Sequence, residues 1–403
     1  MGTHVLISGA SIAGPALAHW LHRFGFETTV VERAPGLRPG GQAVDIRGIA
    51  KDVVRRMGLD AEVRAACTET AGMSDVTRNN RRIVTMRSDL FDGDGLIAEI
   101  EILRGDLSEV FYRATKGTTE YLFGDRIAGL TQHAQGVEVR FSGGSERRFD
   151  LVIGADGLHS GVRALAFDGN DGALRHLGHY LSFFTVPNHL GLDRWALGYQ
   201  EPGRAAGIRS IHDNQDAMAF LSFRSEPLDY DHRDIEGQKQ ILRERLAGMA
   251  WETPWLLERM DDAPDFYFDS CAQVVLGHWS AGRVGLLGDA AFCPSPYSGQ
   301  GTSLAIVGAY VLAGELAAHP GDHEGAFARY EERLRGFVEA NQQLGRRQAG
   351  IVSPMSRLGI AKQYAAMLAM VHVPGSSLVM RRLMRAINDI ELPDYPLPGP
   401  VLT

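Results

Sequence analysis

The first 32 residues read as a strand, a glycine-rich turn, a helix and a second strand, which is how a βαβ unit begins. His4–Ser8 is a short apolar run that predicts a buried strand. Apolar residues then recur at helical spacing over Ala13–Phe24, and Thr28–Glu32 predicts the next strand. Because parallel strands need a crossover helix between them, this opening predicts an α/β protein with a Rossmann-like domain.

The turn after the first strand carries a variant of the dinucleotide fingerprint, Gly9-x-Ser11-x-x-Gly14. Gly9 would make the tight turn, and Gly14 would let the helix pack closely on the strand. Backbone N–H groups and the dipole at a helix N-terminus hold a pyrophosphate. Ser11 replaces the middle glycine, and its hydroxyl can itself donate a hydrogen bond. The candidate pyrophosphate-binding residues are Gly9, Ser11, Ile12, Ala13 and Gly14.

An acidic residue at the end of the second strand supports a dinucleotide site. Glu32 lies 18 residues after Gly14, near the spacing of about 20 expected of a carboxylate that binds a ribose. Such a carboxylate accepts a hydrogen bond from the 2′-hydroxyl of the ribose and repels a 2′-phosphate, so the site suits FAD or NAD. Arg33 beside it is a further candidate. The alternative is a glycine-rich turn that binds nothing.

The composition is that of an ordinary globular protein, with 44% apolar and 22% charged residues. A net charge of −8 offers no basic surface for nucleic acid. Cys67, Cys271 and Cys293 share no metal-ligand or disulfide spacing, which favours reduced thiols and a cytoplasmic location. No stretch reaches the roughly 18 consecutive apolar residues that a spanning helix needs, so no membrane span is expected.

The middle of the chain differs from its two ends. Residues 174–276 are β-rich, with predicted strands at Tyr180–Val186, Ala205–Ile211, Ala217–Phe223 and Phe266–Val275. We expect an antiparallel substrate-binding sheet here, inserted into a discontinuous cofactor domain formed by residues 1–173 and 277–350. Residues 351–403 are expected to form a C-terminal helical segment, in which a helix around Ser377–Ala386 could cover the pocket.

Two more polar turns follow predicted strands. One is Gly154-Ala155-Asp156-Gly157 with Ser160 and Arg163 after it, and the other is Gly288-Asp289-Ala290-Ala291. The second continues through Pro294, Pro296 and Gly299-Gln300-Gly301 into a long helix. Taken singly, Asp156 and Asp289 could be turn or N-cap residues.

These three ordered motifs resemble the class A flavoprotein monooxygenases, the group that contains p-hydroxybenzoate hydroxylase and the tetracycline-inactivating monooxygenases. The resemblance spans the whole chain and fits the compact form of the family. It implies the p-hydroxybenzoate hydroxylase fold, bound FAD, and NADPH or NADH as co-substrate. The flavin would perform the oxygen chemistry through a C4a-hydroperoxide, so no catalytic side chain and no metal site are predicted. Ser11 and Ser303 depart from the family's glycine and asparagine.

The resemblance also assigns further site residues. Asp289 would bind the ribityl chain, the segment around Asp156 would serve FAD and NAD(P)H, and Arg104 would reach the phosphate side. Arg47 could line the flavin pocket or only solvate a loop. The turn before the long helix would bring N–H groups and a positive dipole end to the flavin. Its candidate residues are Pro296, Gly299, Gln300, Gly301 and Thr302.

Candidate substrate residues come from the inserted sheet, where aromatic and soft side chains alternate along the strands. The alternative for each is ordinary core packing, since alternation buries one face in either case. The residues are Phe183, Arg209, Met218, Phe220 and Phe268, with Pro294 near the flavin by resemblance.

The leading interpretation is an FAD-dependent monooxygenase that hydroxylates an aromatic, polyketide or antibiotic-like small molecule. An epoxidase, a Baeyer–Villiger-type oxygenase or a reductase with the same fold stays open. So does a non-catalytic protein that binds FAD and a ligand. A disulfide reductase would carry a second strand–GxGxxG–helix unit and a CxxxxC redox pair. The sequence has neither, which argues against that class. A monomer or a homodimer is expected.

Overall fold

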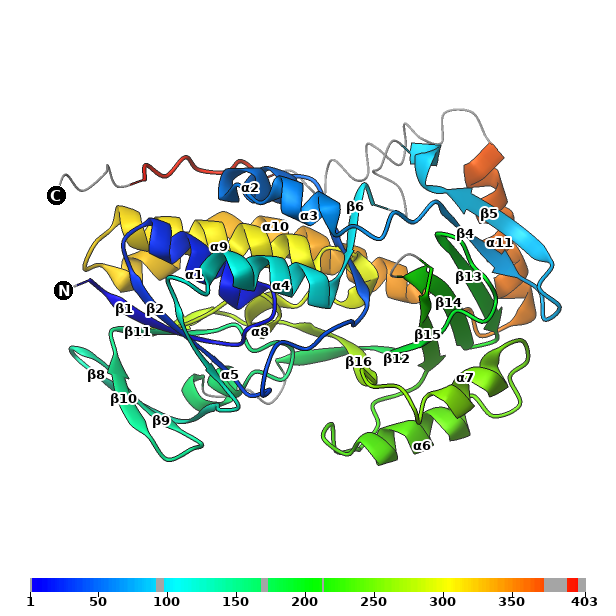
Figure 1. The fold of residues 1–403 in the computed structure, drawn as a ribbon, viewed down its shortest axis with the longest axis horizontal. Coiled ribbons are helices and arrows are strands. Elements are labelled where there is room, and N and C mark those ends of the chain that lie inside the picture. Colours follow the sequence, from blue (N-terminus) through cyan, green and yellow to red (C-terminus); the bar gives the residue numbers. More distant parts are fainter. Residues whose placement is uncertain (1, 92–97, 168–172, 212–213, 373–389, 398–403) are drawn as a thin grey trace.

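The computed structural model describes residues 2–91, 98–167, 173–211, 214–372 and 390–397. A mixed sheet covered by helices occupies one end of the molecule, and a large, mostly antiparallel sheet occupies the other (Figure 1). This confirms the predicted α/β class with an added antiparallel sheet. The expected helix around Ser377–Ala386 lies outside the described residues.

The first sheet has six strands, five of which are parallel to one another, and the helix Ala13–Arg23 is the crossover between His4–Ser8 and Glu27–Glu32. The main chains of these strands run through the largest cluster of buried apolar residues. In this sheet β17 (Ser280–Ala281) alone pairs antiparallel, with β18 (Val284–Leu286). In order across the sheet the strands are β17 (Ser280–Ala281), β18 (Val284–Leu286), β11 (Leu151–Gly154), β1 (His4–Ser8), β2 (Glu27–Glu32) and β7 (Glu120–Phe123).

A layer of helices lies along one side of this sheet (Figure 1). Packed together there are α1 (Ala13–Arg23), α2 (Ala50–Met57), α3 (Asp60–Ala65), α4 (Arg104–Thr115), α9 (Gly301–Ala318) and α10 (His323–Ile351). On the other side lie the strands β8 (Ile127–His133), β9 (Gly136–Phe141) and β10 (Glu146–Phe149), with the short helix α5 (Gly161–Ala166) (Figure 1). A ribbon of β3 (Ala43–Ile46) and β6 (Ile100–Leu103) leads toward the second sheet.

The helix α9 is apolar on all sides because it runs through the core. Its length and composition would suit a membrane span, yet 83% of its apolar window is buried within the protein. A helix that is hydrophobic all round is typical of either setting. Its burial between α1 and α10 accounts for its composition here.

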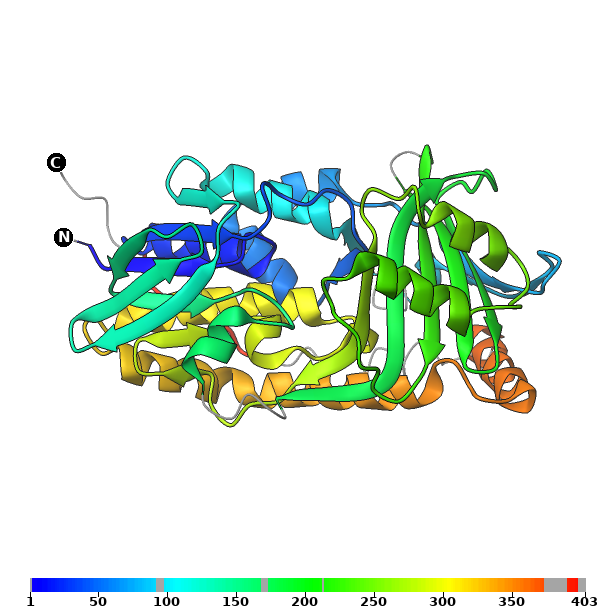
Figure 2. The same cartoon turned by 90° about the horizontal axis from the view of Figure 1, so that it is seen from below.

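The second sheet has seven strands, in the order β16 (Tyr267–Val274), β12 (Leu174–Pro187), β15 (Asp216–Arg224), β14 (Arg204–Ile211), β13 (Trp195–Glu201), β4 (Gly72–Val76) and β5 (Arg82–Arg87). The helices α6 (Ile235–Arg245) and α7 (Thr253–Arg259) cover one face, as Figure 2 shows from below. α11 (Arg357–His372) packs near β5 and β13.

The strands β4 and β5 correct the expected division of the chain. The sequence predicts that all of residues 1–173 belong to the cofactor domain, whereas β4 pairs in parallel with β13 of the large sheet. Strand pairing between distant segments leaves no local trace in sequence, because either partner reads as an ordinary strand. Apart from this hairpin, the proposed division into domains stays a prediction.

Three of the four strands expected in residues 174–276, β14, β15 and β16, begin and end within one residue of their predicted bounds, whereas β12 begins six residues before Tyr180. Gly143-Gly144 turns β9 into β10, and β11 then leaves the hairpin to join the parallel sheet. β13 and α7 were not predicted. β13 is half-buried along its whole length and so shows no alternation, and α7 is only seven residues long.

Candidate functional site

At the first glycine turn, backbone atoms lie so close together that no side chain could fit at Gly9 or Gly14. Gly9 has φ +109°, and a Cβ there would lie 2.5 Å from the Ala155 carbonyl oxygen. A Cβ on Gly14 would lie 1.9 Å from the Gly9 carbonyl oxygen. Ile12 is the N-cap residue of α1, and Ala13 is its first residue. The turn therefore presents the N-terminus of α1 at the carboxyl end of β1.

The three predicted motifs meet at one edge of the parallel sheet. Their strands β1, β11 and β18 are direct neighbours, so the turns that follow them lie side by side. A Cβ on Gly288, where φ is +63°, would lie 3.2 Å from Ala13 Cβ. The buried Arg163 guanidinium donates hydrogen bonds to the carbonyl oxygens of Leu158 at 2.7 Å and Ala290 at 2.9 Å. Arg163 thus links the second motif to the third.

Glu32 and the first turn are hydrogen-bonded to each other. One Glu32 oxygen accepts from the Ala10 amide at 2.9 Å, and the other accepts from the Ala34 amide at 3.0 Å. This fixes the carboxylate beside the turn, where the fingerprint requires it. Arg33 follows with an exposed side chain.

Ser11 is in contact with Arg104, which explains its presence in place of glycine. Arg104 begins α4, and its Nη1 donates to Ser11 Oγ at 2.9 Å. The guanidinium is closely surrounded by protein, and burial lowers the pKa of Arg104. Gly41, at φ +86°, leaves room for this side chain, because a Cβ there would lie 3.0 Å from Arg104 Nε. The structure thus brings two separately predicted residues together at the first turn.

Asp156 mainly shapes its own turn. Its carboxylate accepts hydrogen bonds from the hydroxyl of Ser160 and from the amides of Gly161 at 2.8 Å and Val162 at 3.1 Å, at the start of α5. Burial raises the pKa of Asp156, and the hydrogen bonds oppose that effect. Asp156 is therefore observed as a turn residue that accepts from the first amides of α5, whose N-cap is Ser160, and its predicted role toward a cofactor stays a prediction.

Asp289 differs from Asp156 in its environment. It is the first residue of α8 (Asp289–Phe292), and its side chain is open to solvent although the next three residues are buried. Protein nevertheless surrounds the carboxylate, and the resulting desolvation raises the pKa of Asp289. An exposed group that is closely surrounded by protein lies in a concave place, as a ligand-binding carboxylate would.

The segment Pro294–Gly301, which we call the third turn, lies directly beside the Asp289 carboxylate. A Cβ on Gly301 would lie 3.7 Å from Asp289 Oδ1, and 4.0 Å from Pro294 Cδ. Gly299 has φ +64°, and Gly301 begins the 18-residue helix α9. Pro294, Gln300 and Thr302 are buried, whereas Pro296 and Gly299 are exposed. The turn therefore offers backbone to a ligand while its longer side chains point inward.

Arg47 is buried and hydrogen-bonded to the helix that follows this turn, so it is not a solvent-exposed loop residue. Its side chain is 7% exposed and forms an ion pair with Asp45 at 2.8 Å. Its amide donates to Ser303 Oγ at 3.0 Å, and Ser303 Oγ donates to the Asp45 carbonyl oxygen at 3.4 Å. Burial raises the pKa of Asp45 to about 6 despite the nearby Arg47. Ser303 thus joins the third turn to β3.

Four of the predicted substrate residues share one face of the large sheet. The register pairs Phe183 with Phe220, and Met218 with both Thr185 and Arg209. The Phe183 and Phe220 rings lie 5.4 Å apart. Met218 and Phe183 belong to a small apolar cluster with Leu103 of β6, which shows that this face points toward the cofactor side. We call it the inner face.

Phe268 is on the opposite face and does not join them. It pairs with Ser182 and stacks on Tyr180 at 5.5 Å, in the apolar cluster beneath α6 and α7. Alternation along β16 instead places Tyr267 opposite Phe183 on the inner face, with 37% of its side chain exposed. The face of a strand depends on its register, which local sequence does not show. The structure therefore replaces Phe268 by Tyr267 as a candidate.

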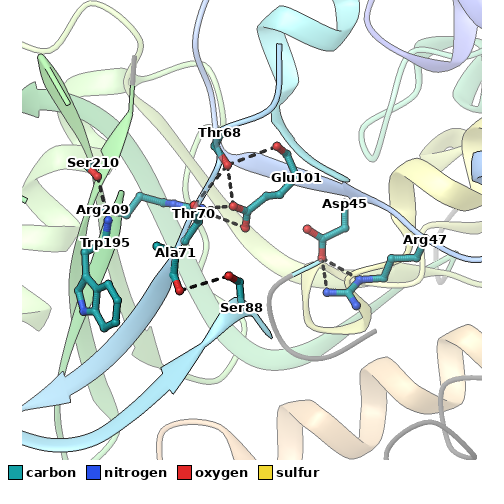
Figure 3. A network of polar contacts seen from close by, with 10 residues as sticks. All are labelled: Asp45, Arg47, Thr68, Thr70, Ala71, Ser88, Glu101, Trp195, Arg209 and Ser210. Atoms are coloured by element: carbon teal, nitrogen blue, oxygen red, sulfur yellow. Dashed lines mark hydrogen bonds and ion pairs between the residues drawn. The ribbon is translucent and has the colours of Figure 1, made fainter. Parts of the chain in front are cut away.

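Arg209 is tied to the β3–β6 ribbon by a polar network (Figure 3). Its guanidinium pairs with Glu101 of β6 and donates to Thr70, and Thr68 donates to Glu101 at 2.7 Å. Glu101 lies opposite Asp45 in the ribbon. The Arg209 side chain is 20% exposed, and both of its terminal nitrogens donate within this network. Sequence reasoning missed Glu101, because nothing in its own strand marks the partner.

The arrangement fits an extended dinucleotide. The first turn suits a pyrophosphate, Glu32 a ribose, Asp289 a polyol, and the third turn a flat electron-poor ring near a helix dipole. The same edge of the sheet carries all four, beside an apolar face of another sheet. Among the residues that the structure describes, no group of three His, Cys, Asp or Glu side chains is placed to hold a metal ion.

Comparison with known proteins agrees with this geometry. Residues 2–343 match the model of a family described as FAD binding domain. A flavin-dependent monooxygenase of Legionella longbeachae is 42% identical over 341 residues, which cover 85% of this chain and 87% of that protein. The chain belongs to the FAD-dependent monooxygenases. Its cofactor is therefore FAD, and it is an oxidoreductase.

Further relatives place this monooxygenase within the family. An uncharacterized protein of Mycobacterium tuberculosis, Rv1260, is 47% identical over 341 residues, covering 84% of this monooxygenase and 92% of that protein. The crystal structure of tetracycline destructase Tet(51) superposes with a TM-score of 0.87 at 36% identity, covering 98% of this chain and all of that one. The monooxygenase thus shares the complete architecture of that structure.

Proposed function

We propose that the protein uses NADPH or NADH and dioxygen to hydroxylate an aromatic, polyketide or antibiotic-like small molecule. The observation that carries the proposal is the convergence of three glycine turns on one sheet edge, facing an apolar inner face. When bound, FAD would accept a hydride from the nicotinamide and activate oxygen. The residues of the chain then have to bind, orient and shield the reactants.

For FAD, we assign roles according to the contacts available to each residue. Amides of the first turn would hold the pyrophosphate, with the guanidinium of Arg104 nearby. Glu32, held by two amide donors, would accept from the ribose. Asp289 is accessible and would accept from the ribityl chain. Gly299–Gly301, at the N-terminus of α9, would stabilise negative charge on the reduced ring.

For the substrate, the inner face supplies apolar and aromatic surface with one charged group. Phe183, Phe220 and Tyr267 would stack on a flat ring, and Met218 would adapt to its outline. The partly exposed Arg209 side chain would give this face a positive charge that favours an acidic or carbonyl group. Enclosure between this face and the third turn would keep water from the reacting atoms.

A tetracycline-like substrate is the most specific form of the proposal. Its support is the likeness to tetracycline destructase Tet(51), at 36% identity across essentially the whole chain. Tetracyclines are polyketides with several fused rings and ionisable hydroxyl groups. An aromatic face that carries the positive charge of Arg209 suits such a molecule.

The test combines a visible spectrum with turnover. Purified protein should show flavin bands at roughly 375 and 450 nm. Tetracycline should then accelerate oxidation of NADPH or NADH, consume oxygen, and give a product heavier by one oxygen atom. A colourless protein that takes up no added FAD would contradict the cofactor assignment, and no acceleration by any tetracycline would contradict this substrate class.

The same measurements distinguish the alternatives. A product heavier by two hydrogen atoms, formed without oxygen, would identify a reductase. Structures of an oxygenated product separate hydroxylation from epoxidation and Baeyer–Villiger insertion. Tight binding of tetracycline without any nicotinamide oxidation would identify a non-catalytic FAD- and ligand-binding protein.

We also propose a cytoplasmic monomer or homodimer. All three cysteines are free thiols and two of them are buried, which suits a reducing compartment. Size-exclusion chromatography with light scattering measures the oligomeric state.

A further inference from the structure

The described C-terminal segment, residues 390–397, crosses the helical layer of the cofactor side. In Figure 1 this red segment runs beside α2, above α9 and α1. Its apolar side chains, Ile390, Leu392 and Tyr395, pack against the main core cluster. We call residues 390–397 the strap.

A glycine in α9 makes room for the strap. A Cβ on Gly314 would lie 2.1 to 2.5 Å from atoms of the Tyr395 ring, so any larger residue would displace that ring. The same ring makes edge contacts with Phe24, which follows α1, at 6.4 Å and with Tyr310 of α9 at 5.3 Å. A glycine inside a long helix costs stability relative to alanine, and close packing against Tyr395 accounts for this one.

Polar contacts fix the strap in position. The Tyr395 hydroxyl donates to Glu315 Oε1 at 2.6 Å, and Arg333 Nε donates to the same oxygen. Glu315 is only 1% exposed, so losing a donor here would leave a buried charge less well compensated. The Tyr310 hydroxyl donates to the Pro393 carbonyl oxygen at 2.7 Å.

The helices that the strap touches all begin at candidate cofactor elements. α1 starts at the Gly9–Gly14 turn, and α9 starts at Gly301. α2 starts just after Arg47, and Arg56 near its end donates to the Pro393 carbonyl oxygen at 3.4 Å. At about 1.5 Å per residue, Gly314 lies about 20 Å along α9 from Gly301. The strap therefore contacts the far ends of three helices whose near ends form the site.

We propose that the strap positions the cofactor site by clamping the C-terminal ends of α1, α2 and α9. A packed helix moves as a rigid rod, so an axial shift at Gly314 reaches the third turn almost undiminished. Tyr395 is in this view a positioning residue that never touches FAD. The proposal rests on FAD binding alone and needs no substrate or nicotinamide, so its failure is separate from any failure of the proposed reaction.

The test measures FAD affinity of the apoprotein by flavin fluorescence, together with thermal unfolding of the apo and FAD-bound forms. Gly314→Ala places a methyl group where the Tyr395 ring lies, and a chain ending at residue 389 removes the strap. Each should weaken FAD binding about tenfold, within the usual range of coupling between distant sites. Gly336→Ala is the matched control, because Gly336 lies in α10 and its added Cβ would meet nothing within 4 Å.

A double-mutant cycle assigns the effect to the strap. In the chain that ends at residue 389, Gly314→Ala should have no further effect on FAD affinity, since its partner is gone. An equal loss in both backgrounds would attribute the effect to α9 itself and overturn the proposal. Unchanged affinity in both single variants, with equal loss of apo and FAD-bound thermal stability, would show a purely structural strap. If the shortened chain does not fold, Tyr395→Ala replaces it in the cycle.

Discussion

The edge of the parallel sheet owes its shape to the main chain, whereas the inner face of the large sheet owes its shape to side chains. At the edge, backbone atoms approach more closely than any side chain would allow, as at Gly9 and Gly14. On the inner face, side chains such as Phe183 and Phe220 stand on a regular pleated surface. Changes at the edge therefore disturb the main chain, whereas changes on the inner face alter the side chains that it presents. A family can vary its substrates in this way while keeping one cofactor site.

The largest effect is expected at the edge. Gly14→Ala puts a methyl carbon 1.9 Å from the Gly9 carbonyl oxygen, so the turn and α1 must separate. We expect loss of bound FAD, measured as the ratio of absorbance near 450 nm to that at 280 nm, roughly the flavin and protein bands. Gly117→Ala is the control, since a Cβ there meets nothing within 4 Å. Full flavin content in Gly14→Ala would break the contrast between edge and face.

The two faces of the large sheet should respond differently to the same substitution. Phe268→Ala empties a packed position beneath α6 and α7, and should lower the free energy of unfolding by about 3–5 kcal/mol. Phe183→Ala on the inner face should cost much less stability but raise KM for the substrate. Urea denaturation and tetracycline-dependent NADPH oxidation measure the two effects. Similar losses of stability would show that the inner face is ordinary core.

Single polar contacts at the edge should have intermediate effects. Asp289→Ala and Glu32→Ala should each weaken FAD binding about tenfold, because each removes one charge-assisted hydrogen bond to a sugar hydroxyl. Titration of apoprotein with FAD gives the affinity, and Asp89→Ala at an exposed carboxylate is the control. Unchanged flavin affinity in both variants would contradict the mapped site.

The smallest effect concerns Asp45, where the edge meets the face. Its pKa is raised from 3.8 to about 6, so the folded protein binds this proton more tightly than the unfolded chain does. Asp45 therefore contributes to the free energy of unfolding in full below about pH 4, and this contribution is lost as the pH rises through about 6. Asp45→Asn should remove that part of the pH dependence, seen in apoprotein melting temperatures between about pH 4 and 7. If the melting temperatures of Asp45→Asn and of the unaltered protein differ by the same amount at every pH in this range, the prediction is wrong.

The edge could be predicted from sequence and the face only in part. Gly9, Gly14 and Glu32 are close in sequence, and their spacing alone reports a local geometry. Phe268 and Tyr267 are adjacent in one strand, and only the register with β12 decides which of them faces the site. The pairing of Arg209 with Glu101, and of β4 with β13, joins segments far apart in the chain. Such contacts follow from the tertiary fold and leave no mark on neighbouring residues.

The pairing of β4 with β13 also limits how the protein can be divided or recombined. During synthesis, the β4–β5 hairpin emerges long before its partner strand, and β11 must wait for β18 to complete the parallel sheet. A fragment that ends between them leaves unpaired strand edges, which readily associate with other chains. Exchanging the substrate sheet with that of a relative, to change what the enzyme accepts, therefore requires moving residues 72–87 together with the contiguous insert.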